Sequence, residues 1–200
     1  MVHQFFIDKR PHNALTYEEY STNMHKKVEE TNAGELNEKE KQMFEYTKLN
    51  SHRSKRIDKT YKVDPELEAA IKSVSEKQIW MIITEDWCGD SAQNLPYIAK
   101  MTSVNKNIDF RIIERDKNLD IIDLYLTNGT SRSIPKMIAF NEDGTELFQW
   151  GPRPKEIAAL VGEWKEAGIE MEEIKEKLHL WYGRNRGKSI ESEFKSLLSK

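Results

Sequence analysis

The order of apolar and amphipathic segments between residues 64 and 168 constrains the fold of this chain most strongly. Gln78–Thr84 is an apolar run that ends at two acidic residues, and Ile108–Ile113 is a second strand candidate. Ser91–Met101, between them, has the apolar spacing of a helix. Two strands joined through a helix form a parallel βαβ unit, so this pattern predicts an α/β domain.

The flanking segments extend this unit into a mixed sheet. Asp64-Pro65 marks a helix start before the first strand, and Leu119–Leu126 predicts a helix after the second. Lys136–Phe140 and Glu146–Trp150 are short strand candidates that the turn signal Asn141–Gly144 joins as a hairpin. A helix over Pro154–Trp164, ended by Gly168, completes the order. We expect about four strands, with helices available for both faces.

The two ends of the chain read as helices with narrow apolar stripes. Thr16 caps the segment YEEYSTNMHKKVEE, and a second helix begins after Asn37. Met171–Trp181 and Ser189–Leu198 are helix candidates near the C-terminus. The predicted division is a helical extension over residues 1–62, the α/β domain over 63–168, and helices over 169–200 that pack on the domain.

Composition excludes several classes of protein. A single cysteine excludes an intramolecular disulfide and zinc sites built from two or more thiolates, and the five histidines show no paired metal-ligand spacing, so no metal is expected. A net charge of −3 makes nucleic acid an unlikely main partner. The longest apolar run is far below the about 18 residues of a membrane span, and the N-terminus lacks a signal-peptide pattern. We expect a cytoplasmic protein.

The single cysteine, Cys88, lies between the first strand and the following helix, inside Trp87-Cys-Gly-Asp-Ser91. Unpaired N–H groups and the helix dipole at that position favour a thiolate and lower the thiol pKa below about 8.5. Nearby carboxylates, including Asp90, have the opposite effect on the pKa. Sequence leaves this balance open. Ser91, one turn along the helix, is placed to donate a hydrogen bond to the sulfur.

Here the sequence resembles the thioredoxin superfamily. Trp87-Cys88-Gly89 has the form of the family motif WCGPC, and Pro96 stands where thioredoxins carry a helix-kinking proline. Ile134-Pro135 resembles the cis-proline loop. The resemblance covers about residues 64–168 and implies a thioredoxin-like fold with a cis peptide bond beside Cys88. It also implies a substrate groove whose residues are Trp87, Gly89, Asp90, Ile134 and Pro135.

Departures from the family pattern limit the chemistry. Ser91 replaces the second cysteine, Ile82 stands at the position of the buried acid, and the family's lysine falls near Ile112. The chain therefore cannot form the internal disulfide that releases a mixed-disulfide intermediate. A monothiol variant attacks through Cys88, and an external thiol such as glutathione resolves the intermediate. No resident cofactor is expected.

Three functional interpretations follow from these residues. The first is a monothiol thiol-disulfide oxidoreductase, whose partners are protein or small-molecule thiols and disulfides. The second is a thioredoxin-like interaction or adaptor protein without catalysis. The third is a redox sensor that is reversibly modified at Cys88.

Two basic segments lie outside the resemblance. The first is a cationic stretch of Lys48, Arg53, Lys55, Arg56, Lys59 and Lys62. A solvated helix face or linker is favoured there over an anion site, because no nucleic-acid motif accompanies it. The second, Gly183–Ser189, is one residue short of a phosphate loop and follows a helix, so it reads as a helix stop. A local anion patch at Arg184, Arg186 and Lys188 is the alternative.

Overall fold

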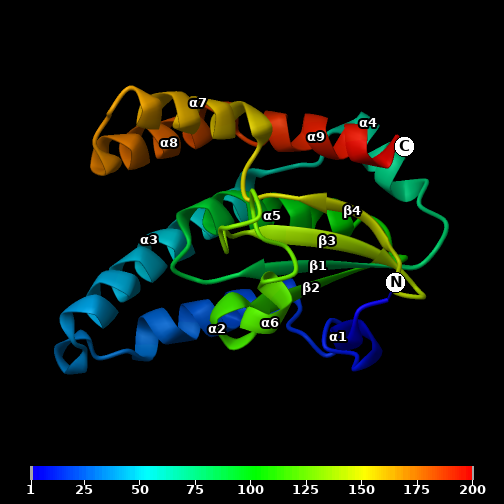
Figure 1. The fold of residues 1–200 in the computed structure, drawn as a ribbon, viewed down its shortest axis with the longest axis horizontal. Coiled ribbons are helices and arrows are strands. Elements are labelled where there is room, and N and C mark those ends of the chain that lie inside the picture. Colours follow the sequence, from blue (N-terminus) through cyan, green and yellow to red (C-terminus); the bar gives the residue numbers. More distant parts are fainter. Residues whose placement is uncertain (1, 200) are drawn as a thin grey trace.

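A four-stranded mixed sheet lies at the centre of the computed structural model, which describes residues 2–199 (Figure 1). The strands are β1 (Gln78–Thr84), β2 (Ile108–Glu114), β3 (Lys136–Asn141) and β4 (Glu146–Trp150), in the order β2-β1-β3-β4. β1 pairs with β2 in parallel, and the other two pairs are antiparallel. The chain crosses from β1 to β2 through α5 (Gly89–Thr102), as a parallel pair requires. The predicted α/β class and mixed sheet are confirmed.

Helices that are far apart in the sequence cover one face of the sheet. α4 (Pro65–Lys72), α5 and α9 (Lys188–Leu198) pack there, and their apolar side chains share one buried cluster with the strands. Trp80 of β1 and Phe194 of α9 are fully buried within it, with ring centroids 5.6 Å apart. The C-terminal helix therefore belongs to the main hydrophobic core.

The opposite face is covered by short elements. α1 (Gln4–Ile7) supplies Phe5 and Phe6, and α6 (Leu119–Ile122) supplies two isoleucines to a second cluster. The helix predicted over Leu119–Leu126 is wrong in length, because the chain leaves the helix at Ile122. The Tyr125 ring is buried in the cluster and its hydroxyl donates to Glu146 at 2.6 Å, which anchors this segment to β4.

The N-terminal helices α2 (Tyr17–Glu30) and α3 (Glu38–Thr60) each begin with a reciprocal capping box, at Thr16 and Asn37. α3 packs along α5, and α2 packs against α3 and β2. Leu15 pairs with Ile112, on the outer edge of β2, through a short antiparallel bridge. This contact covers an edge that would otherwise expose unpaired backbone groups.

Residues 155–185 form a helical pair beside the sheet (Figure 1). α7 (Lys155–Glu166) and α8 (Met171–Asn185) pack on each other through a third apolar cluster, whose buried members all belong to these two helices. α8 continues past the predicted end at Trp181, and the stop follows at Arg186 and Gly187, both with left-handed backbone. Among the described residues, no helix has the length and apolar content needed to cross a membrane.

Candidate functional site

Cys88 lies where β1 ends and α5 begins. It is the N-cap residue of α5, so its sulfur lies near the first backbone N–H groups of the helix, although its side chain accepts no capping hydrogen bond from them. The half-buried thiol donates a hydrogen bond to the carbonyl oxygen of Ile134, with Sγ and O 3.4 Å apart. The Ile134–Pro135 peptide bond is cis. The strand end, the helix start and the proline loop thus meet at one sulfur atom.

The surroundings of Cys88 favour the protonated thiol. Burial raises its pKa to about 11, and the Asp90 carboxylate acts in the same direction. The Ser91 hydroxyl and the N–H groups of Ser91 and Asp90 oppose these effects without reversing them. In the unliganded protein at neutral pH, Cys88 is therefore a thiol that donates to Ile134.

Ser91 lies in a buried position behind the thiol. Its side chain is buried, and its hydroxyl oxygen accepts a hydrogen bond of 2.5 Å from Thr84. Thr84 is the last residue of β1, so this bond joins the strand end to the first turn of α5. The pair fixes the turn that carries Cys88.

Asp90 is directed into the protein. Its carboxylate accepts hydrogen bonds from Arg153 at 2.5 Å and from the Tyr182 hydroxyl at 2.7 Å. The side chain of Asn94 donates to the Tyr182 oxygen at 3.0 Å. Burial raises the pKa of Asp90, whereas Arg153 and Tyr182 stabilise its ionised form. Asp90 thus connects the first turn of α5 to α8 through its hydrogen bond with Tyr182.

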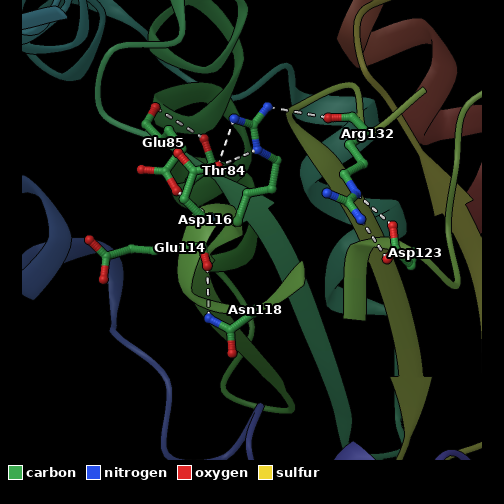
Figure 2. Close-up of polar contacts among 8 residues, drawn as sticks. Thr84, Glu85, Glu114, Asp116, Asn118, Asp123 and Arg132 are labelled. Carbon is green, nitrogen blue, oxygen red and sulfur yellow. Dashed lines mark hydrogen bonds and ion pairs between the residues drawn. The ribbon is translucent and has the colours of Figure 1, made fainter. Parts of the chain in front are cut away.

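The other side of Cys88 is held by a polar network at the ends of β1 and β2 (Figure 2). Glu85 accepts a hydrogen bond from the backbone N–H of Asp116 at 2.7 Å. The Arg115 guanidinium lies over the Trp87 ring, 4.9 Å from its centroid, and also donates to the carbonyl of Arg132. Arg132 pairs with Asp123 through two hydrogen bonds. These contacts fix Trp87 and the loop that leads to Ile134.

A cavity of about 340 Å³ opens over the thiol and is roofed by helices from both ends of the chain. α3, α7, α8 and the Trp87–Asp90 turn all contribute to its wall. Its cationic side chains are Arg53, Arg153, Lys165 and Lys175. Its apolar side chains include Met43, Val161, Ile174 and Leu178. The cavity therefore combines apolar surface with positive charge beside a sulfur atom.

His179 of α8 closes the cavity above the turn. A Cβ atom added at Gly89 would lie 2.9 Å from its Cε1 atom, so only glycine fits there without a shift of the ring. Burial lowers the pKa of His179 to about 4, and Arg53 and Lys175 add to this effect. Its Nδ1 atom is buried and has no hydrogen-bond partner within residues 2–199. A neutral imidazole thus faces the motif.

A thioredoxin family model matches residues 36–167, about two thirds of the sequence. The chain belongs to the thioredoxin family. The match begins just before α3 and takes in all of that helix, the Cys88 turn, the proline loop and the hairpin. This thioredoxin family member thus shares part of its N-terminal helical region with the family, ahead of the boundary predicted at residue 63.

Solved structures share the fold of this thioredoxin family member at low sequence identity. A protein of unknown function from Pseudomonas aeruginosa, PA1234, superposes with a TM-score of 0.56 at 13% identity, over 84% of this chain and 88% of its own. An HIV epitope-scaffold superposes with a TM-score of 0.54 at 16% identity, over 78% of this chain and 90% of its own. Comparison with curated proteins gives no match.

The structure brings Cys88, Ser91, Trp87, Gly89, Asp90, Ile134 and Pro135 to one region, as these contacts show. Sequence reasoning missed Arg153, His179 and Tyr182, which complete the surroundings of the motif. None of the three belongs to a motif or lies near Cys88 in sequence, so no local pattern indicated them. Within residues 2–199, no group of three or more His, Cys, Asp or Glu side chains is arranged to hold a metal ion.

Proposed function

We propose that this thioredoxin family member performs monothiol thiol-disulfide exchange through Cys88. The observation that carries the proposal is the position of the sulfur: at the N-cap of α5, 3.4 Å from the Ile134 carbonyl and on the wall of a cavity of about 340 Å³. A disulfide that enters this cavity meets a nucleophile at the N-terminal end of a helix, where the helix dipole favours the thiolate. We place this chemistry in the cytoplasm, where free thiols are abundant.

The proposed reaction has two balanced steps. First, the Cys88 thiol loses its proton to solvent, and the thiolate attacks a partner disulfide; a bond forms to one partner sulfur while the second partner sulfur leaves as a thiolate. Second, the thiolate of an external thiol such as glutathione attacks the partner sulfur of the mixed disulfide. The Cys88 thiolate leaves and regains a proton. The net reaction is exchange of one thiol for another in the partner disulfide.

Each motif residue has a role in this scheme. Ser91 and the helix N–H groups stabilise the thiolate, because their hydrogen bonds lower the pKa of Cys88. Trp87 and Gly89 line the cavity through which the partner approaches. Ile134 and Pro135 are buried outside that lining, and the Ile134 carbonyl orients the resting thiol. Asp90 holds the resting thiol protonated and ties the motif to α8. The cations of the cavity favour a partner that carries carboxylates, as glutathione does.

The test follows the rate at which native protein forms an adduct with oxidised glutathione, measured by intact mass at several pH values. Because Cys88 is the single cysteine, any disulfide adduct reports on it. A pKa of about 11 leaves about one thiolate in a thousand at pH 8. The rate should rise about tenfold per pH unit between pH 7 and 10.

Unfolded protein in urea is the control, because its exposed thiol has a pKa of about 8.5 and reacts faster at pH 7.5. Catalysis is measured as Cys88-dependent exchange between oxidised glutathione and a second thiol, with Cys88→Ser as the blank. The proposal is contradicted if the native protein forms no adduct at pH 9 while the unfolded protein does.

The raised thiol pKa also favours a second candidate, an interaction protein that uses the same surface without turnover. A buried, protonated thiol is a weak nucleophile, and Ser91 cannot resolve a mixed disulfide. Affinity capture with wild-type protein and Cys88→Ala discriminates between the two functions. Unchanged partners favour the interaction protein, and loss of reductant-sensitive partners favours thiol exchange.

A further inference from the structure

A second and larger cavity, of about 610 Å³, lies between the C-terminal half of α3 and the turn that joins α8 to α9. The two basic segments of the sequence meet here. Arg56 and Lys62 come from the end of the α3 region, and Arg186 and Lys188 come from the α8–α9 turn. Segments more than a hundred residues apart in sequence thus surround one cavity with positive charge.

These four cations have little local compensation. Within residues 2–199, none of them forms an ion pair. Glu191 is the one carboxylate of the lining, and it already accepts hydrogen bonds from the Tyr61 hydroxyl at 2.7 Å and the Asp64 N–H at 3.2 Å. Cations gathered in a concave surface without counter-charge create a local field that attracts anions.

The floor and walls of the cavity are rigid aromatic surface. Tyr61 and Tyr97 pack edge to face, with ring centroids 4.6 Å apart. Tyr97 also lies against Gly187, where an added Cβ would approach its Cε1 atom to 2.5 Å and the backbone has φ of 88°. Burial raises the pKa of the Tyr97 hydroxyl, and the charges of Arg56 and Arg186 act against it. The turn is therefore held on α5, with two cations close to the ring.

We propose that this cavity binds a small phosphate-bearing anion, either as pyrophosphate or as the diphosphate of a nucleotide. Its volume is in the range of small-molecule sites, and arginine and lysine are the side chains that recognise phosphate oxygens. The site is separate from the Cys88 cavity, although Tyr182 lines it and donates its hydroxyl hydrogen bond to Asp90. The proposal does not depend on thiol chemistry.

The test is isothermal titration calorimetry of the full chain with pyrophosphate and with ADP, in metal-free buffers of equal ionic strength. Arg56→Gln and Lys188→Gln remove exposed cations of the lining, so both variants should fold. Lys59→Gln removes the same charge from the same helix as Arg56 but outside the lining. We expect saturable one-to-one binding, weakened about tenfold by each lining variant and less than twofold by Lys59→Gln.

The two ligands distinguish the source of the anion. Equal affinity for pyrophosphate and ADP indicates a site for the diphosphate alone, and tighter binding of ADP indicates that the nucleoside contacts the tyrosines. The proposal is overturned if neither ligand shows saturable binding. It is also overturned if Lys59→Gln weakens binding as much as the two lining variants do. An oligonucleotide that binds with the same dependence on Arg56 and Lys188, when both small ligands fail, also overturns it and identifies a nucleic-acid surface.

Discussion

The two sides of the Cys88 thiol are built from different parts of the chain. On the loop side, Trp87, Arg115 and Ile134 come from strand ends and the proline loop. On the helix side, Arg153, His179 and Tyr182 come from the segment after β4 and from α8. The loop side places the sulfur, whereas the helix side encloses it and holds Asp90, whose charge raises the thiol pKa.

This difference shows which parts of the chain determine the pKa of Cys88. The N-cap position of Cys88 alone would favour a thiolate. The packing of α8 and α3 over the motif removes water from the sulfur, and burial is the largest cause of its raised pKa. Helices packed around a family motif can thus oppose the electrostatic effect of the motif itself.

The substitution expected to destabilise the helix side most is Arg153→Met. The substitution leaves the Asp90 carboxylate, which is 8% exposed, without its cation, and an unpaired buried charge is costly. We expect a loss of about 3 kcal/mol in the free energy of unfolding at pH 7, measured by urea denaturation. The loss should shrink as the pH falls, because protonation of Asp90 removes the unpaired charge.

The matched control on the loop side is Arg132→Met. It breaks the ion pair between Arg132 and Asp123 that Figure 2 shows. The two side chains are 45% and 44% exposed. Solvent screens an exposed pair and reduces its contribution to stability, so this variant should unfold near the wild-type midpoint. Equal losses from the two arginine variants would contradict the asymmetry between the sides.

Acid should destabilise the helix side through His179. Its pKa is about 4 in the folded protein and about 6.5 when unfolded, so the unfolded chain binds an extra proton between these values. Stability is fully retained above about pH 6.5 and is lost as the pH falls toward 4. Because the ring is partly exposed, we expect His179 to account for about 1–2 kcal/mol of that loss.

Denaturation curves at pH 7 and pH 4.5 measure this effect. His179→Gln should reduce the difference in stability between the two pH values by that amount. His52→Gln, an exposed position on α3, serves as the control and should leave the difference unchanged. A wild-type acid response that persists in His179→Gln would assign the effect to other groups.

The smallest predicted effect tests the contact between the two sides directly. Gly89→Ala places a Cβ atom 2.9 Å from the His179 ring, which must shift. Overpacking of this kind costs about 1 kcal/mol when the opposing atom is the end of a side chain. In the His179→Ala background the same substitution should cost nothing, so a double-mutant cycle gives a coupling of about 1 kcal/mol. Additive effects would show that the two residues do not press on each other.

The central fold was predictable from sequence because its strands have clear local boundaries. β1 and β4 have the predicted bounds: Gln78–Thr84 is an apolar run that ends at Glu85, and Glu146–Trp150 lies between the hairpin turn and Gly151. The helix after β2 was predicted too long, because burial of Tyr125 against β4 ends the helical spacing. That contact depends on tertiary packing, which local periodicity does not report.

The candidate site divides in the same way. Cys88, Ser91 and Pro135 carry motif signals, and strand order brings them together. Asp90 carried one as well, but its partners Arg153 and Tyr182 are 63 and 92 residues away and belong to no motif. The approach of His179 to Gly89 depends on how α8 folds back over α5. Sequence therefore predicted the position of the thiol and left its pKa undecided.

The separate apolar cluster of α7 and α8 makes these helices a candidate unit of local unfolding. Their packing is complete within the pair, and polar contacts such as Tyr182 to Asp90 and Lys175 to Tyr46 attach them to the motif and to α3. Amide hydrogens of α8 should then exchange with solvent through an opening that leaves β1 intact. Each such opening would hydrate the sulfur, which adds a second route to Cys88 beside entry through the cavity.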